Sequence, residues 1–162
     1  MVDAYQDITI PFQMSSVEFF TMVKEHLNEN GVMVVNMNMR GNNEGNINQY
    51  LSDTIASVFD HIVTVDVDGS TNRELYASSN ADMVKTLENN ANETGHSDLR
   101  DMMLHVADTS SVYEAGDYIM TDDKAPVELL GMQVIDQLIQ GEVAYYKDIF
   151  EKDGINGLLE SL

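Results

Sequence analysis

Residues 31–39 read Gly31-Val32-Met33-Val34-Val35-Asn36-Met37-Asn38-Met39, a glycine followed by a nearly continuous apolar run. Such a run predicts a β-strand that is covered on both faces, as in sheets flanked by helices. Helical patterns lie on either side of it, at residues 16–28 before it and 46–59 after it. The order helix, buried strand, helix predicts an α/β fold.

The first residues of the chain, Val2-Asp3-Ala4-Tyr5, are typical of the end of a buried strand that carries an acidic residue. With the elements that follow, they predict the second half of an α/β unit. We expect one partial α/β domain over residues 1–162. Its sheet core and two helices are expected in residues 1–79, and a mainly helical part in residues 80–162.

Capping and turn residues predict where the elements begin and end. Ser15 or Ser16 is the expected N-cap of the first helix, and Gly31 is expected to adopt the left-handed conformation after it. A strand–turn–strand hairpin is expected next, followed by three helices. The expected ranges are 61–67 and 73–78 for the strands, 68–72 for the turn, and 81–90, 97–107 and about 126–154 for the helices.

Asn36 and Asn38 place polar side chains at the carboxyl end of the apolar strand, where open α/β sheets bind their ligands. Hydrogen bonding to the next loop is an equally good explanation. That loop, residues 40–46, lacks the Lys-Ser/Thr ending of a P-loop and contains no G-x-G-x-x-G pattern. We interpret it as a turn with a helix cap.

Composition excludes several classes of function. The 162-residue chain has a formal net charge of −20, which disfavours binding to nucleic acid or to anionic membrane surfaces and suits a cationic ligand such as an amine. It has no cysteine, no apolar run long enough for a membrane span, and no basic-then-apolar leader. We therefore expect a cytoplasmic protein.

Side-chain spacing also excludes two kinds of catalytic site. The four histidines lie on separate elements without metal-ligand spacing, so no metal site is expected. No serine lies in a G-x-S-x-G pattern, and no cysteine can act as a nucleophile.

Two acidic places remain as candidate sites. Asp3, at the expected strand end, can accept a proton from an amine or anchor an ammonium group. Asp122 and Asp123 precede Pro126 and the long last helix. Either carboxylate can cap that helix, because proline and negative charge are both favoured at a helix N-terminus.

Several of these segments, in this order, resemble the spermidine/spermine synthase-like proteins, the polyamine aminopropyltransferases. The likeness covers most of the chain, and its later segments resemble the divergent bacterial branch of that group. The segments are Asp3-Ala4-Tyr5, Ile10-Pro11-Phe12, Ser16-Val17-Glu18-Phe19-Phe20, Leu27 to Val32, Asp68 to Asn72, Ala77-Ser78-Ser79 and Thr121 to Glu128.

The resemblance implies the Rossmann-like fold of class I S-adenosylmethionine-dependent methyltransferases, whose last strand is antiparallel. This chain would supply the end of strand 4, then strands 5, 6 and 7 with flanking helices and a long C-terminal helix. The implied reaction is transfer of an aminopropyl group from decarboxylated S-adenosylmethionine to a diamine. Asp3 would be the catalytic base, with Tyr5, Gln6, Asp122 and Asp123 as substrate-binding residues.

Two departures from the family pattern affect the expected activity. The family's gate reads Asp-Ser-Ser/Thr-Asp-Pro, whereas this chain has Gln6 in place of the second carboxylate. The glycine-rich cofactor loop and the acidic nucleoside anchors of the family lie on earlier strands that this chain lacks. We therefore expect it to be inactive alone and to self-associate or to bind a completing N-terminal half. A methyltransferase-like fragment and a non-catalytic acidic binding or assembly module stay open as alternatives.

Overall fold

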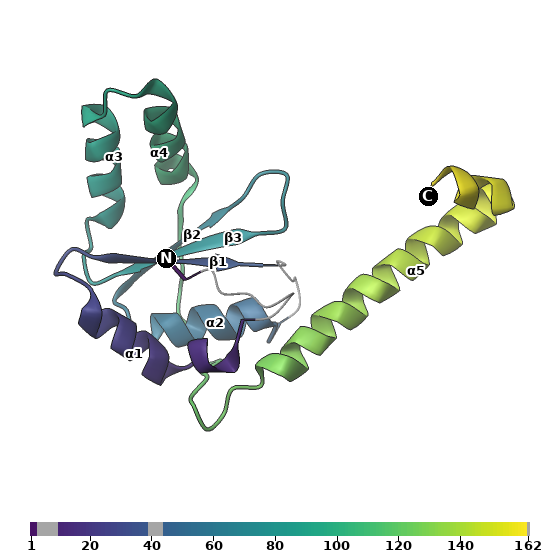
Figure 1. Cartoon of the computed structure of the whole chain (residues 1–162), viewed down its shortest axis with the longest axis horizontal. Coiled ribbons are helices and arrows are strands. Elements are labelled where there is room, and N and C mark those ends of the chain that lie inside the picture. The colour runs from purple at the N-terminus through teal and green to yellow at the C-terminus, as the bar shows by residue number, and fades with distance from the viewer. Residues whose placement is uncertain (3–9, 39–43, 162) are drawn as a thin grey trace.

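The computed structural model describes residues 1–2, 10–38 and 44–161 (Figure 1). It is a mixed α/β structure with a four-stranded sheet, so the expected α/β class is confirmed. In chain order the elements are η1 Phe12–Met14, α1 Val17–His26, β1 Val32–Met37, α2 Ile47–Ala56, β2 His61–Asp66, β3 Arg73–Ser78, α3 Met83–Glu93, α4 Ser97–Thr109, β4 Ser111–Val112 and α5 Val127–Glu160.

The sheet has the strand order β1-β3-β2-β4. β3 is antiparallel to both β1 and β2, so these two strands run parallel to each other with β3 between them. At the outer edge of β1, Val2 forms a parallel bridge with Val35. The Val2 amide donates to the Val34 carbonyl at 2.7 Å, and the Asn36 amide donates to the Val2 carbonyl at 3.3 Å.

Helices cover both faces of the sheet. α1 and α2 lie on one side, and the antiparallel pair α3–α4 lies on the other (Figure 1). The main core forms between the sheet and the α1–α2 layer, because alternate residues of β1 point to that side. Its fully buried members include Phe20, Met33, Val35, Leu51 and Leu75.

Predictions were made for both ends of α1: the N-cap is confirmed, and the conformation predicted for Gly31 after the helix is wrong. The Ser16 side chain accepts a hydrogen bond from the Phe19 amide at 3.3 Å and is therefore the N-cap. Gly31, by contrast, does not adopt a positive φ, so the expected left-handed conformation is wrong. A Cβ atom at Gly31 would lie 2.9 Å from Cβ of Leu27, which shows that space rather than handedness requires glycine.

The hairpin of β2 and β3 is confirmed. Its turn is closed by a hydrogen bond from the Val67 amide to the Asn72 carbonyl at 3.1 Å, and Gly69 has a φ of 69°. β4, a two-residue strand on the outer edge of β2, was not expected from the sequence.

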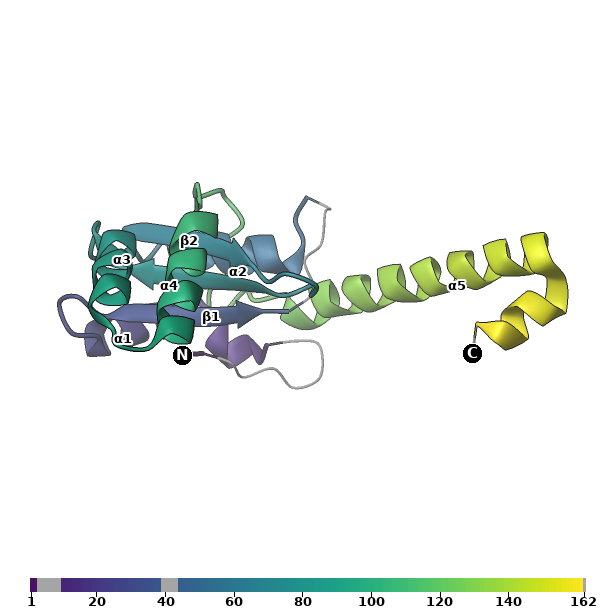
Figure 2. The same cartoon turned by 90° about the horizontal axis from the view of Figure 1, so that it is seen from above.

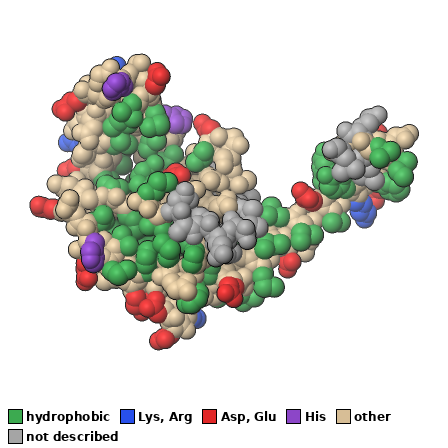
Figure 3. All heavy atoms as spheres, viewed as in Figure 1, with side chains coloured by type: hydrophobic (Ala, Val, Ile, Leu, Met, Phe, Trp, Pro, Cys, Tyr) green, Lys and Arg blue, Asp and Glu red, His purple; other side chains and the backbone are tan. Residues whose placement is uncertain are grey.

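α5 leaves the body of the molecule and extends away from it (Figure 2). Among the residues of α5 whose burial is described, the buried ones lie at its beginning, where Val127 and Leu130 pack against the core. Gly154, at φ 64° and ψ −156°, is non-helical and separates the long helix from a second, short helical stretch, so the predicted end of the long helix at Gly154 is confirmed. Hydrophobic side chains cover much of the projecting part (Figure 3). No helix in the described part of the chain is both long and apolar enough to cross a membrane.

Candidate functional site

Carboxamide side chains gather at the carboxyl edge of the sheet. Because β1 and β2 are parallel, both end at this edge, and β3 begins there. The Asn72 side chain in the β2–β3 turn donates a hydrogen bond from Nδ2 to Oδ1 of Asn36 at 3.1 Å. The polar side chain of Asn36, near the end of β1, is therefore held in place by the turn that leads into the neighbouring strand β3.

The start of α2 brings further carboxamides to this edge. Asn46 caps the helix by accepting a hydrogen bond from the Gln49 amide at 3.0 Å, while the Gln49 side chain accepts one from the Gly45 amide at 2.7 Å. Ser52 on the same helix contacts the sulfur of Met37, the last residue of β1, at 3.5 Å. Asn48, one turn earlier, is only 8% exposed.

Charged residues also lie at this edge. Arg73 binds the Asp66 carboxylate with two hydrogen bonds, from Nε at 2.6 Å and from a terminal guanidinium nitrogen at 3.2 Å. Glu74, which lies opposite Asn36 in the register of β1 and β3, adds a second carboxylate, and its Oε2 is buried. The described residues at this edge therefore combine carboxamides, which can both donate and accept hydrogen bonds, with acidic groups, and they can orient a polar ligand.

Three of the site residues predicted from the sequence lie outside the described residues, namely Asp3, Tyr5 and Gln6. Val2, which precedes Asp3 in the chain, pairs with β1 beside Asn36. The predicted catalytic role of Asp3 and the predicted binding roles of Tyr5 and Gln6 stay predictions.

Asp122 does not cap the last helix. Its carboxylate accepts a hydrogen bond from the Ser16 hydroxyl at 2.5 Å, and its amide donates to the Glu18 carboxylate at 3.0 Å, so Asp122 binds the first turn of α1. Asp122 and Asp123 lie in a tight turn closed by Thr121 and Lys124. Among the described residues, neither aspartate forms a hydrogen bond with α5 or with the carboxamides of the sheet edge, so the expected cap is wrong.

A buried carboxylate on α2 was missed by the sequence reasoning. Asp53 is completely buried and accepts three hydrogen bonds from the segment after β4. Oδ1 accepts from the Tyr113 hydroxyl at 2.7 Å and from the Gly116 amide at 2.9 Å, and Oδ2 accepts from the Tyr118 amide at 3.1 Å. The available signal was a lone aspartate within a helical stretch whose neighbours Leu51 and Ile55 are apolar.

These four residues, called the Asp53 cluster below, hold the otherwise irregular segment 113–120 against α2. Burial, followed by the hydrogen bond to Asp53, raises the pKa of Tyr113 well above its ordinary value, so the phenol stays protonated and keeps donating. Next to the cluster, the Met120 amide donates to the Thr54 hydroxyl at 2.9 Å. Both carboxylate oxygens of Asp53 accept hydrogen bonds from protein groups, which is typical of a structural carboxylate.

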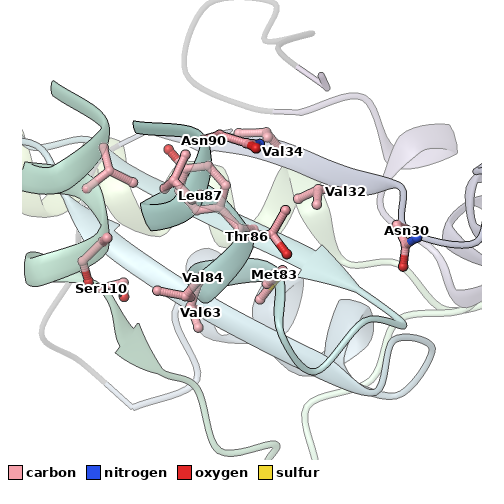
Figure 4. Close-up of a pocket in the computed structure, with 13 residues that line it drawn as sticks. Asn30, Val32, Val34, Val63, Met83, Val84, Thr86, Leu87, Asn90 and Ser110 are labelled. Carbon is pink, nitrogen blue, oxygen red and sulfur yellow. Dashed lines mark hydrogen bonds between the residues drawn. The ribbon is translucent and has the colours of Figure 1, made fainter. Parts of the chain in front are cut away.

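A cavity of about 350 Å³ lies between α3, α4 and the sheet. Figure 4 shows that Val32, Val34 and Val63 of the sheet line it together with Val84 and Leu87 of α3. Its lining includes one titratable side chain, Tyr76, whose pKa is raised by burial and then by the nearby charge of Glu74. The residues that line the cavity include no histidine, lysine, aspartate, glutamate or cysteine, so it is a poor candidate for acid–base catalysis.

No group of three or more histidine, cysteine, aspartate or glutamate side chains in the described ranges is arranged to hold a metal ion.

Comparison with known proteins identifies a relative over the whole chain. No protein-family model matches. Over 179 aligned residues the chain is 51% identical to a probable polyamine aminopropyl transferase from Bifidobacterium longum (strain NCC 2705). This chain is related to a polyamine aminopropyltransferase. The resemblance predicted from the sequence is thereby confirmed, and the chain spans 40% of the length of that curated relative.

One solved structure is also similar, a crystal structure of a probable spermidine synthase from Corynebacterium glutamicum ATCC 13032. It shares 15% sequence identity with this chain, with a TM-score of 0.36. The match covers 74% of this chain and 48% of that one.

Proposed function

We propose that this chain forms the amine-binding side of a polyamine aminopropyltransferase and completes its activity together with a nucleoside-binding part. The 51% identity to the Bifidobacterium longum relative, over the whole chain, carries the proposal. The transferred group would be an aminopropyl group and the acceptor a diamine or a similar amine. The net charge of −20 agrees with a cationic substrate.

The topology of the sheet supports the position that we assign to the chain within such an enzyme. A class I methyltransferase sheet ends in the strand order 4-5-7-6, with strand 7 reversed. Val2, β1, β3 and β2 follow that order, Val2 pairs in parallel with β1, and β3 is antiparallel to both neighbours. We therefore assign Val2 to the end of strand 4 and the three strands to positions 5, 7 and 6.

In this proposal Asp3 is the base, and the carboxamides of the sheet edge bind the amine. A neutral amine is needed, because an ammonium group has no lone pair with which to attack carbon. The Asp3 carboxylate would take the proton and stabilise the cationic acceptor. Asn36 and Asn72 are suited to orient polar hydrogens of the acceptor, since their side chains are already fixed to each other.

The residues of this chain do not fit the nucleoside half of the donor, decarboxylated S-adenosylmethionine. The described carboxyl edge offers carboxamides, the Arg73–Asp66 ion pair and Glu74, and Oε2 of Glu74 is buried. In the family that this chain resembles, the acidic nucleoside anchors lie on earlier strands. The sequence also lacks a glycine-rich G-x-G-x-x-G turn. We therefore propose that another part of the protein binds the donor and that this chain alone does not catalyse aminopropyl transfer.

The outer edge of β1 is where such a part would join. Val2 bridges β1 at Val35, whereas Val32, nearer the start of the strand, is 40% exposed. An open strand edge beside an apolar cavity is a template for an additional strand. We propose that the completing part pairs with this edge.

The test is a chimera in which this sequence replaces the aligned region of the Bifidobacterium longum relative. It is assayed for release of methylthioadenosine and for the polyamine product. We expect turnover by the chimera, none by this chain alone, and a loss of about 10²- to 10⁴-fold in Asp3→Asn. Asp7→Asn is the matched control, because it removes a carboxylate from the same segment and should leave the rate unchanged.

The same assay separates the alternatives. A methylated product from S-adenosylmethionine would show methyl transfer instead. A folded chimera without turnover, combined with saturable spermidine binding by this chain, would indicate a non-catalytic acidic binding module. Spermidine binding that weakens steadily with salt would indicate only a counterion atmosphere.

A further inference from the structure

The sequence contains four pairs in which glycine directly follows aspartate or asparagine. They begin at Asn30, Asp68, Asp153 and Asn156. Such pairs can react within the chain, because glycine has no Cβ atom to shield its backbone nitrogen from the preceding side chain. The reaction also needs a glycine amide without a hydrogen bond and a side chain that can turn toward it. The structure decides which of the four pairs meets both conditions.

Asp68 and Gly69 are the two central residues of the turn between β2 and β3 (Figure 1). The Ser70 amide donates to the Val67 carbonyl at 3.2 Å, which closes a four-residue β-turn around them. The amide that joins the two central residues takes no part in this closing hydrogen bond. Within the part of the chain that the structure describes, the Gly69 amide donates no hydrogen bond.

The Asp68 side chain is free to turn. It is 90% exposed, and it pairs with Nε2 of His105 across 3.6 Å. That separation is too long for a hydrogen bond, so the contact does not fix the carboxyl group. Gly69 also has open space beside it, because a Cβ atom built there would have no atom within 4 Å. The carboxyl carbon of Asp68 can therefore approach the Gly69 nitrogen.

The other three pairs are restrained. The Gly31 amide donates a backbone hydrogen bond at 2.8 Å, so the nitrogen that follows Asn30 is engaged. Asp153 and Asn156 lie in helical stretches of α5. Helical backbone angles direct each amide along the helix axis and each side chain outward, which keeps the two apart.

We propose that Asp68–Gly69 is a site of isoaspartate formation in the folded protein. The Gly69 nitrogen attacks Cγ of the protonated Asp68 carboxyl group and forms a nitrogen–carbon bond. The carboxyl hydroxyl leaves as water together with the amide proton, which gives a five-membered succinimide ring. Water then adds to one of the two ring carbonyls and breaks its bond to nitrogen. Addition at Cγ restores aspartate, and addition at the main-chain carbonyl leaves isoaspartate, whose backbone runs through Cβ and Cγ.

The modified turn would act on the carboxyl edge of the sheet. Isoaspartate adds one carbon to the main chain of a turn that holds Asn72 by two hydrogen bonds. The Asn72 carbonyl accepts from the Val67 amide at 3.1 Å, and the Asn72 amide donates to the Ser70 hydroxyl at 3.1 Å. The Asn72 side chain in turn fixes Asn36. In a consequence that rests on the proposed function, the modification should weaken binding of the acceptor amine.

The first test follows the modification itself and needs no activity. The folded chain is incubated for weeks at neutral pH and physiological temperature and is then digested with trypsin. Cleavage after lysine and arginine places the four pairs in three peptides, 25–40, 41–73 and 153–162. A protein isoaspartyl methyltransferase with labelled S-adenosylmethionine then marks isoaspartate in each peptide. We expect most of the label in peptide 41–73.

Two controls assign the label. Asp68→Glu keeps the charge but can close only a six-membered ring, which forms far more slowly, so it should remove the label from peptide 41–73. In denaturant the restraints on the other three pairs are lost, so the label should spread to peptides 25–40 and 153–162. The proposal is wrong if the folded chain carries its label mainly in those two peptides, or if Asp68→Glu keeps the label in 41–73.

The second test uses the chimera with the Bifidobacterium longum relative. The aged chimera should show a higher KM for the acceptor amine than the fresh one, whereas the aged Asp68→Glu chimera should not. An unchanged KM in an aged chimera that contains isoaspartate would refute the link from the turn to Asn36. A chimera without any turnover would contradict the proposed catalytic function, and the peptide analysis would still decide the modification.

Discussion

Oδ1 of Asp53 accepts hydrogen bonds from both the Tyr113 hydroxyl, at 2.7 Å, and the Gly116 amide, at 2.9 Å. A completely buried carboxylate on α2 thereby organises a segment that follows it by some 60 positions in the chain. Because hydrogen bonds to a buried charge are stronger than neutral ones, this contact is a large local contribution to stability.

Asp53→Asn should lower the free energy of unfolding by about 2 to 3 kcal/mol. An amide nitrogen in place of Oδ2 would face the Tyr118 amide, which is also a donor, so one hydrogen bond becomes a repulsive contact. Urea denaturation monitored by circular dichroism measures the change. Asp101→Asn on the exposed side of α4 is the control and should change stability by less than about 0.5 kcal/mol. Equal stability of the two variants would contradict the structural role of Asp53.

Gly116→Ala should destabilise the protein by about 1 to 3 kcal/mol. A Cβ atom at this position would lie 2.5 Å from Oδ2 and 3.1 Å from Cγ of Asp53, so the segment or the carboxylate must move. Gly95→Ala is the matched control, because a Cβ atom there has no atom within 4 Å. A thermal melt of both variants gives the comparison, and an unshifted melting temperature for Gly116→Ala would refute the close approach.

Stability should fall at alkaline pH partly because of Tyr113. Its pKa is raised above the ordinary value of 10.0 by burial and by the hydrogen bond to Asp53. The folded state therefore holds the phenol proton more tightly than the unfolded state. The resulting stabilisation is fully present below about pH 10 and decreases as the pH rises above that value.

Tyr113→Phe removes this titrating proton, so the free energy of unfolding should fall less steeply between about pH 9.5 and 11.5 than in the wild type. At neutral pH the variant should be less stable, because it loses the hydrogen bond to Asp53. Tyr145→Phe on exposed α5 is the control and should keep the wild-type slope. The measurement is the urea midpoint as a function of pH. A Tyr113→Phe slope equal to that of wild type would show that this phenol does not contribute.

Ser16→Ala should cost about 1 kcal/mol, since Ser16 both caps α1 and donates to Asp122. The contact joins residues that are 106 positions apart. A double-mutant cycle with Asp122→Ala isolates it by chemical denaturation, and we expect the combined loss to be smaller than the sum of the single losses. Strict additivity would mean that the hydroxyl and the carboxylate do not stabilise each other.

Local patterns in the sequence predicted most elements of the fold. The apolar run of β1, the alternation in β2 and β3 and the helical period of α1 and α2 each depend on neighbouring residues only. The turn at residues 68–72 and the cap at Ser16 were predicted for the same reason. The relationship to polyamine aminopropyltransferases was likewise visible in short segments and is confirmed by the Bifidobacterium longum relative.

The partners of Asp122 and Asp53 could not be predicted in this way. A carboxylate before a proline has the local pattern of a helix cap, but the fold places the Asp122 turn at the start of α1 instead of leaving it to α5. The acceptor role of Asp53 depends on a segment that follows β4 in the chain and contacts α2 only in the tertiary structure.

The sequence by itself determined the α/β class, the order of the elements and the kinship of this chain, because periodicity, caps and short motifs are properties of neighbouring residues. The tertiary structure decided that β3 lies between β1 and β2, that Asp53 is buried as a structural carboxylate, and that the apolar α5 stands away from the body. These features depend on contacts between residues far apart in the chain, and on which apolar surfaces the rest of the molecule leaves uncovered.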